Sequence, residues 1–349
     1  MPKQTRVLVT GAGGPAGMGT IRSLVHARGM RVVAADVNPL APGLYWAHER
    51  ATLPPAHTRA FVPSLLKLLE GHDVDVLFPT VDEEVSVVAA NMERIRRQVH
   101  CLVGDSVGVE ACNDKWMTYL WLKKAGIPVV ETLLVGDGRS LRRDATRIGY
   151  PLAVKPRASR GGRGLHVCRN WKELSESFSA LKRALPFKDA YVDVPEAADI
   201  ILQEYLPGTE YDTIVLLDRK GEALACVPMR AVRWRVQEQQ REIVTEHDWD
   251  VEEMCTETVM SLGLRCPVDV ELARDRAGKL KILDVNPRVG GDVDLATAAG
   301  CNIPLMYVRL AMGREVRPCG FKEGVVLVRY VGIQTIQPED IPVHRRKGR

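Results

Sequence analysis

The chain has 349 residues, of which 46% are hydrophobic and 26% are charged, and its formal net charge at pH 7 is +4. This length allows two or three domains with separate cores, and so small a net charge gives no support to nucleic-acid binding. No apolar run reaches the length of a signal peptide core or a membrane span. The eight cysteines show no C-x-x-C or metal-binding spacing, so we expect reduced thiols in a cytoplasmic protein. The basic run HRRKGR at 344–349 is expected to be a solvated tail.

Residues 7–24, VLVTGAGGPAGMGTIRSL, predict a strand, a tight turn and a helix. Gly13 and Gly14 lie in the turn, where backbone N–H groups and a helix N-terminus can bind an anion. Asp36 ends the next strand, at the spacing of an acid that binds ribose. Taken alone, the stretch is consistent with a bound dinucleotide and equally with a scaffold turn.

Strands alternate with helices up to about residue 110, which predicts a parallel sheet with helices on its faces. The strands are expected at RVLVT, RVVAAD, VDVLFPT and VHCLVG. Thr80, Asp82 and Glu83 follow the third strand, at the edge where open α/β sheets bind ligands, although Asp82 can instead start the next helix. A helix capped by Asn113 or Asp114 comes next. Beyond Tyr150, one helix from Trp171 to about Leu185 is followed by strands whose short connections favour antiparallel hairpins.

A cluster of oxygen ligands is predicted in CPVDVELARDRAGKLKILDVNPRVGG. If the DRAG turn closes a hairpin of even loop length, Glu271 lies on the same face as Asp284 and Asn286, with Arg288 just beyond. Carboxylate and amide oxygens in this number suit Mg²⁺ that is shared with phosphate. The alternative is an ordinary solvated strand face.

Two further segments favour a nucleotide site. Lys155 ends an apolar strand, and the glycine- and arginine-rich loop after it can cover a polyphosphate, although a solvated hairpin turn has similar composition. In QEYLPGTEYD, an extended segment at Glu204 precedes Glu210, a spacing that suits adenine and then ribose; the alternative is a plain turn.

In this order the segments resemble the ATP-grasp superfamily, and among its members the carbamoyl-phosphate synthetase large subunit and related stand-alone carboxylate–amine ligases. The most specific stretches are ACNDKWMTYLWLKKAGIPV, YPLAVKPRASRGGRGL, ILQEYLPGTEYD and LDVNPRVGG, and the likeness runs from about residue 5 to about residue 330. It implies a mixed α/β and α+β fold. A Rossmann-like domain over 1–111 would precede an ATP-grasp small subdomain over 112–205 and a C-terminal antiparallel-sheet subdomain over 206–349.

The resemblance also implies roles for individual residues. Arg288 would steady the transferred phosphoryl group and Lys155 would act with it. One or two Mg²⁺ ions, or Mn²⁺, would bind Glu271, Asp284 and Asn286. The family usually has glutamate where Asp284 stands, which leaves the number of metal ions open. The residues expected to bind ATP are Lys115, Lys155, Arg160, Gly161, Gly162, Arg163, Gly164, Glu204, Tyr205, Leu206 and Glu210.

For the second substrate we expect an amino acid or small peptide. Arginines would face its carboxylate and aspartates its ammonium, although Arg233 and Arg235 equally suit a solvated edge strand and Asp294 equally suits a helix cap. Since the first domain of this family usually binds no NAD, its glycine loop is expected to line the same site. The residues assigned to it are Gly13, Gly14, Arg230, Arg233, Arg235, Gly290, Gly291, Asp292 and Asp294.

The predicted function is amide-bond formation through an acyl phosphate, with small-molecule carboxylate and amine substrates and with ADP and phosphate as products. Three alternatives remain: phosphorylation of carbamate or bicarbonate, an NAD(P)-dependent oxidoreductase, and an inactive nucleotide-binding regulator. Dimers are frequent in the family that the chain resembles, so a homodimer is the expected assembly. The charge and hydropathy lead us to expect neither a nucleic acid nor a membrane as partner.

Overall fold

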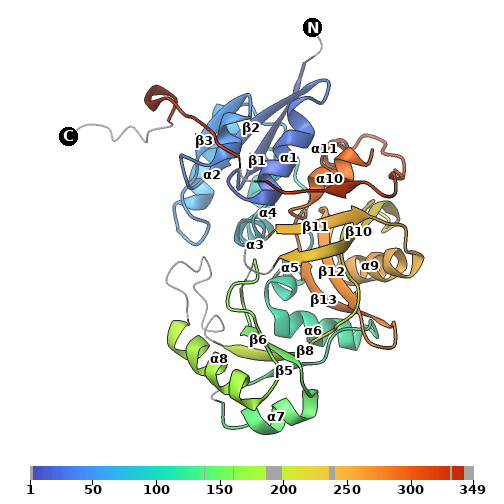
Figure 1. The fold of residues 1–349 in the computed structure, drawn as a ribbon. Coiled ribbons are helices and arrows are strands. Elements are labelled where there is room, and N and C mark those ends of the chain that lie inside the picture. Colours follow the sequence, from blue (N-terminus) through green and yellow to red (C-terminus); the bar gives the residue numbers. More distant parts are fainter. Residues whose placement is uncertain are drawn as a thin grey trace, which may run out of the picture.

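The computed structural model describes residues 3–136, 138–159, 161–185, 199–235, 240–330 and 332–341, without the side chains of 233–235, 240 and 241. Three sheets follow one another along the chain (Figure 1). The four-stranded sheet of the N-terminal region lies at one end of the molecule, the six-stranded sheet in the middle, and the other four-stranded sheet at the opposite end. The basic tail lies outside the described residues.

The first sheet is parallel, as predicted, with the order β3-β2-β1-β4. Its strands are β1 (Thr5–Thr10), β2 (Met30–Asp36), β3 (Glu49–Thr52) and β4 (Val76–Phe78), and its helices are α1 (Pro15–Val25), η1 (Pro42–Tyr45), α2 (Phe61–Gly71), α3 (Asp82–Ala90) and α4 (Met92–Ile95). The strand predicted at VHCLVG is wrong, because that segment joins the sheet through a single bridge from His100 to Val76. The Tyr307 hydroxyl binds the N–H and C=O of Leu102 at 3.0 and 3.1 Å and so takes the place of a neighbouring strand.

The second sheet is antiparallel, with the order β5-β8-β6-β7. Its elements are β5 (Thr132–Leu134), α7 (Leu141–Ile148), β6 (Leu152–Pro156), β7 (His166–Cys168), α8 (Trp171–Ala184) and β8 (Ile200–Glu204). Helices α5 (Ser106–Asn113) and α6 (Lys115–Lys124) connect it to the first sheet. The Asp114 side chain caps α6 by accepting the N–H groups of Trp116 and Met117, which confirms the predicted cap.

The third sheet has the order β13-β12-β9-β10-β11-β14 and is antiparallel. Its elements are β9 (Glu210–Leu217), β10 (Ala223–Arg235), β11 (Gln240–Thr245), α9 (Trp249–Ser261), β12 (Val268–Arg274), β13 (Leu280–Asn286) and β14 (Val326–Leu327). The predicted strand EALACVPM and the arginine-rich segment after it form one long strand, β10.

Helices α10 (Val293–Ala298) and α11 (Ile303–Ala311) return to the first sheet (Figure 1). The Asn302 amide donates to the Ser23 carbonyl at 2.8 Å, and the Tyr307 hydroxyl donates to the Leu77 carbonyl at 2.9 Å. Beyond β14 the chain runs along the first domain, where Asp340, in η3 (Pro338–Asp340), pairs with Arg50 at 2.7 Å. The first and third sheets therefore share one hydrophobic core. None of the helices described here is long and apolar enough to cross a membrane.

Candidate active site

The β12–β13 hairpin brings the predicted metal ligands together. Glu271 lies directly opposite Asp284, and Asp269 lies opposite Asn286. The Asn286 amide nitrogen lies 3.4 Å from a Glu271 oxygen and 3.3 Å from an Asp269 oxygen. The common face expected for Glu271, Asp284 and Asn286 is thus confirmed, but the even loop expected to produce it is wrong, because the register shifts by one residue between Glu271 and Leu272. Asp269, on the same face of β12 as Glu271, joins the cluster.

Two lysines from other elements lie beside these carboxylates. Lys115 Nζ, at the start of α6, contacts Asp284 Oδ2 at 2.5 Å, with both side chains about an eighth exposed. Burial acts to raise the pKa of Asp284, but Lys115 and Lys155 outweigh it and hold this pKa below its usual value. Lys155, near the end of β6, has no such close carboxylate partner in the described parts of the chain. Burial and the Lys115 charge lower its pKa to about 8. A phosphate would supply the missing negative charge.

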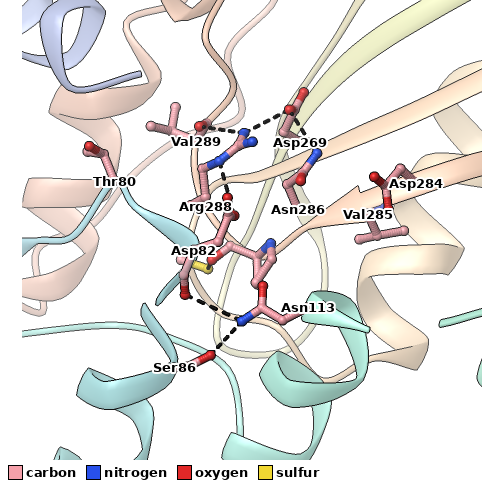
Figure 2. A network of polar contacts seen from close by, with 12 residues as sticks. Thr80, Asp82, Ser86, Asn113, Asp269, Asp284, Val285, Asn286, Arg288 and Val289 are labelled. Atoms are coloured by element: carbon pink, nitrogen blue, oxygen red, sulfur yellow. Dashed lines mark hydrogen bonds and ion pairs between the residues drawn. The ribbon is translucent and has the colours of Figure 1, made fainter. Parts of the chain in front are cut away.

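Arg288 lies between two carboxylates from different domains (Figure 2). Its Nη1 contacts Asp269 Oδ2 at 2.8 Å, and its Nε lies 3.2 Å from Asp82 Oδ1 at the start of α3. Nη1 also donates to the Val289 carbonyl at 3.1 Å. Apart from Arg288, the buried Asp82 Oδ1 has no hydrogen-bond partner in the described part of the chain. Within the described residues, this oxygen is thus neutralised by the contact with Arg288.

Asn113 holds the start of α3 against α5. Its amide donates to the Asp82 carbonyl at 3.3 Å and to the Ser86 hydroxyl (Figure 2). Thr80 is buried and donates to the Thr10 carbonyl at 2.7 Å. These bonds fix the backbone that presents Asp82 to Arg288.

The glycine-rich loop joins β6 to β7. Gly161, Gly162 and Gly164 all have positive φ, which favours glycine, and the first two have open space where a side chain would begin. At the base of the loop, Arg157 contacts the capping carboxylate of Asp114 at 2.6 Å. This pairing was not predicted. Arg163 is described, whereas the predicted Arg160 lies outside the described residues.

The predicted adenine segment follows β8. Glu204 forms an ion pair with Lys281 of β13 at 2.7 Å, which the sequence did not suggest. Tyr205 is partly exposed, and Leu206 is buried against Val130. Leu206 therefore anchors the segment, and Glu210 begins β9 just beyond it.

In the N-terminal glycine turn, the Gly13 N–H donates to Asp36 Oδ2 at 2.7 Å, and Asp36 Oδ1 accepts from the Asn38 N–H at 2.8 Å. The acid expected at a ribose thus binds the turn itself. Gly14 precedes α1 as its N-cap. This arrangement gives the turn a structural role and offers no support for a dinucleotide.

Three of the residues assigned to the second substrate form ion pairs within the protein. Arg230 pairs with Glu246, Asp292 with Arg329, and Asp294 with Arg22. A substrate carboxylate or ammonium would have to compete with these ions, so their predicted roles stay predictions.

The structure also limits the roles of the residues assigned to the second substrate. The side chains of Arg233 and Arg235 lie outside the described set. Asp294 lies within the first turn of α10, which begins at Val293, so the alternative role of Asp294 as a helix cap is wrong. Gly290 and Gly291 lie close to Asp269 and Pro15, respectively.

The donor set fits Mg²⁺ that is shared with a nucleotide. Within the described residues, no group of three or more His, Cys, Asp and Glu side chains is placed to hold a metal by itself. Glu271 and Asp284 supply two carboxylates, and the Asn286 side chain supplies an amide oxygen. Mg²⁺ is commonly held by one or two carboxylates together with substrate phosphates. The cationic neighbours Lys115, Lys155 and Arg288 suit the phosphates.

Comparison with known proteins identifies the fold. Residues 196–332 match a family described as "ATP-grasp in the biosynthetic pathway with Ter operon", and residues 7–102 match the PylC-like N-terminal domain. The chain is an ATP-grasp protein. The predicted family and fold class are confirmed, and ATP with Mg²⁺ as cofactor agrees with the relatives found.

Among curated relatives, the 2-oxoglutarate carboxylase small subunit of Hydrogenobacter thermophilus is 24% identical over 60% of this chain and 45% of its own length. The N-terminal section of the carbamoyl phosphate synthase large chain of Methanopyrus kandleri is 23% identical over 82% of this chain and 51% of its own. The chain therefore spans about half the length of these two relatives.

Solved structures agree on the fold. The ADP complex of PurK, an N5-carboxyaminoimidazole ribonucleotide synthetase, has a TM-score of 0.73 at 16% identity and covers 94% of this chain and 82% of its own. The biotin carboxylase domain dimer of the Hydrogenobacter thermophilus 2-oxoglutarate carboxylase, crystallised with MgADP, ADP and bicarbonate, has a TM-score of 0.71 at 19% identity. It covers 98% of this chain and 73% of its own.

Proposed function

We propose that this ATP-grasp protein is an ATP-dependent carboxylate–amine ligase acting on an amino acid or small peptide. One observation carries the proposal: Lys115, Lys155 and Arg288 converge from three elements on the carboxylates of one hairpin. Cations and metal-binding carboxylates in one site serve phosphoryl transfer, which depends on positioning and charge neutralisation. The assembly proposed is a homodimer.

The proposed reaction has two steps. The substrate carboxylate attacks the γ-phosphorus of ATP, a new O–P bond forms, and the bond to ADP breaks. The amine then attacks the carbonyl carbon, the bond to phosphate breaks, and the amine proton passes to solvent. Bound Mg²⁺ would neutralise phosphate charge beside Glu271, Asp284 and Asn286. Lys115 and Lys155 would hold the phosphates, Arg288 would steady the acyl phosphate, and the glycine loop would exclude water.

A second candidate is phosphorylation of bicarbonate or carbamate. The names of several relatives favour it, because they describe carboxylases, a carbamoyl phosphate synthase and a complex with bicarbonate. Both candidates use the same phosphate and metal residues. They differ in whether the phosphorylated acid is organic.

The test is ADP release from ATP and Mg²⁺ with pools of amino acids, with and without hydroxylamine as a surrogate amine. An organic carboxylate should increase ADP release and yield its hydroxamate, identified by mass. ADP release that depends on bicarbonate and not on any amino acid would favour the second candidate. The absence of ADP release with every acid would contradict both.

Asp82→Asn is expected to lower turnover about tenfold without changing ADP affinity. The substitution keeps the size of the side chain but removes the charge that orients Arg288, and a hydrogen bond to a charged group contributes roughly 1.5–3 kcal/mol. Steady-state kinetics and ADP titration measure the two effects. Asp105→Asn, at an exposed N-cap without a side-chain capping bond, is the control. An equal loss of ADP affinity would place Asp82 in the nucleotide site instead.

Gly13→Ala is expected to weaken the binding of the acceptor substrate more than the binding of ATP. A Cβ there would lie 3.1 Å from Ala41 Cβ and 3.3 Å from Asp36 Oδ2, so the turn must shift by a few tenths of an ångström. The KM for the acceptor identified by the assay should rise, while the KM for ATP stays constant. Gly71→Ala, which has open space around it, is the control. A rise in the ATP KM alone would refute the acceptor role of this turn.

A further inference from the structure

A cavity of about 440 Å³ lies at the C-terminal end of β9. Four separate parts of the chain form it: the segment after α4, the β9–β10 turn, Arg265 between α9 and β12, and the end of α11. Its volume falls within the usual range for small-molecule sites. No residue assigned to ATP, metal or acceptor lines it.

The register of the third sheet separates this cavity from the metal ligands. Asp212 of β9 lies opposite Glu271. Leu217, which lines the cavity, lies five residues further along the same strand. At about 3.4 Å per residue, Asp212 and Leu217 are roughly 17 Å apart along the strand. A ligand in the cavity would therefore be distinct from the nucleotide.

The cavity has an excess of positive charge. Arg96, Arg219 and Arg265 line it together with His100, and its one acidic residue is Asp218. Asp218 is already used by its own turn, where one carboxylate oxygen accepts the N–H groups of Lys220 and Glu222 at 2.8 and 2.9 Å.

The three guanidinium groups have no carboxylate partner among the described residues. The one hydrogen bond from any of their side chains runs from Arg265 Nη1 to the Leu264 carbonyl at 3.0 Å. Arg96 and Arg219 are exposed and Arg265 is half-buried, so water reaches these charges and an anion can reach them too. Guanidinium groups also bind phosphate and carboxylate oxygens in two-point geometry. The arrangement thus leaves both charge and hydrogen-bond donors for an anionic ligand.

The remaining lining is apolar. Leu102, Leu217 and Leu310 belong to it, and Leu217 and Leu310 are buried. Leu102 is partly exposed, so a small organic phosphate would contact this side chain as well as the arginines, whereas an inorganic anion would not use it. We propose that this cavity is a second ligand site that binds a small organic phosphate ester through Arg96, Arg219 and Arg265.

The location gives such a ligand a structural consequence. Arg96 belongs to the N-terminal domain, and Arg219 and Arg265 flank strands of the third sheet. The segment from 96 to 102 also pairs with β4, since the Leu77 N–H donates to the His100 carbonyl at 2.9 Å. A bound phosphate would thus join the two domains at the strand that leads to Thr80 and Asp82, so binding should raise the Tm.

The test uses the full chain in EDTA with saturating ADP, so that the nucleotide site is filled. Fructose 1,6-bisphosphate and pyrophosphate are titrated by calorimetry into wild type, into Arg219→Gln/Arg265→Gln, and into the control Arg59→Gln/Arg183→Gln. The control removes two exposed arginines elsewhere.

We expect the sugar bisphosphate to bind wild type and the control equally, and more tightly than pyrophosphate. The cavity variant should lose at least about tenfold in affinity, which corresponds to roughly 1.4 kcal/mol, while its ADP affinity stays unchanged. Equal affinity in the cavity variant, or no binding to wild type, would overturn the proposal. Tighter binding of pyrophosphate than of the ester would refute the organic ligand.

Discussion

Lys155→Met is expected to abolish ATP turnover and at the same time to raise the Tm of the ligand-free protein. The two effects have one cause. In the described structure, burial and the Lys115 charge disfavour the Lys155 ammonium and lower its pKa to about 8. ATP phosphates would relieve this cost and use the charge in phosphoryl transfer, so the methionine variant should lose at least about 100-fold in turnover.

The pH dependence of stability follows from the same shift. The native protein releases the Lys155 proton near pH 8, whereas the unfolded chain holds it to about 10.5. Because the unfolded state binds more protons in this window, Lys155 should make wild type more stable as the pH rises from about 8 to 10.5. Lys155→Met should lack this contribution, and its gain in Tm should be greatest below pH 8.

Thermal scans across pH and ADP-release assays measure both effects. Lys172→Met, at an exposed position of α8, is the matched control and should change neither property. Near wild-type turnover in Lys155→Met would remove Lys155 from the phosphate site. A lower Tm below pH 8 would show that the buried ammonium stabilises the ligand-free fold.

Asp284→Asn is expected to abolish turnover and, in contrast, to destabilise the protein. The carboxylate contacts Lys115 at 2.5 Å, and both side chains are largely buried. Removal of its charge leaves the Lys115 ammonium without its principal partner, and breaking a buried pair costs roughly 3–5 kcal/mol. The same change removes one of the two carboxylates proposed for Mg²⁺, so turnover should fall by at least about 100-fold.

Asp284→Glu separates these two roles. Glutamate keeps the charge that Lys115 needs, so the free energy of unfolding should recover most of its loss. If the carboxylate also binds Mg²⁺, turnover should recover in part, with a changed KM for Mg²⁺. Denaturant unfolding and Mg²⁺-dependent kinetics measure the two. Full turnover in a well-folded Asp284→Asn variant would exclude Asp284 as a metal ligand.

Local patterns were enough to predict the hairpin and its charges. Alternation along the second strand predicted that Asp284 and Asn286 share a face, because side chains in a strand repeat every two residues. The turn alone does not bring Glu271 to that face: Arg274 pairs with Leu280, and a one-residue shift between Glu271 and Leu272 places Glu271 opposite Asp284. The parallel first sheet followed from alternating strands and helices in the same way.

Contacts between distant segments could not be predicted from such patterns. The ion pair of Glu204 with Lys281 joins two sheets, and Arg157 reaches the cap of α6. The hydroxyl of Tyr307, more than 200 positions away in the sequence, replaces a strand beside Leu102. None of these partners lies at a fixed spacing in the sequence, so the contacts can be identified only from the assembled structure.

The N-terminal glycine turn shows how a local pattern can be ambiguous. Its spacing to Asp36 matches a dinucleotide site, yet the Asp36 carboxylate accepts the Gly13 N–H. An aspartate at this spacing fits both roles, because the sequence pattern is the same whether it binds the turn or a ribose. The register of β1 and β2, which brings both ends of the motif together, gives the structural interpretation.

The most direct test of the central claim is a crystal structure of the full chain with Mg²⁺ and a non-hydrolysable ATP analogue. The account predicts phosphates between Lys115 and Lys155, Mg²⁺ on Glu271 and Asp284, and adenine beside the segment from Glu204 to Leu206. A nucleotide bound instead at the Gly13 turn, or Mg²⁺ bound away from the β12–β13 hairpin, would contradict it.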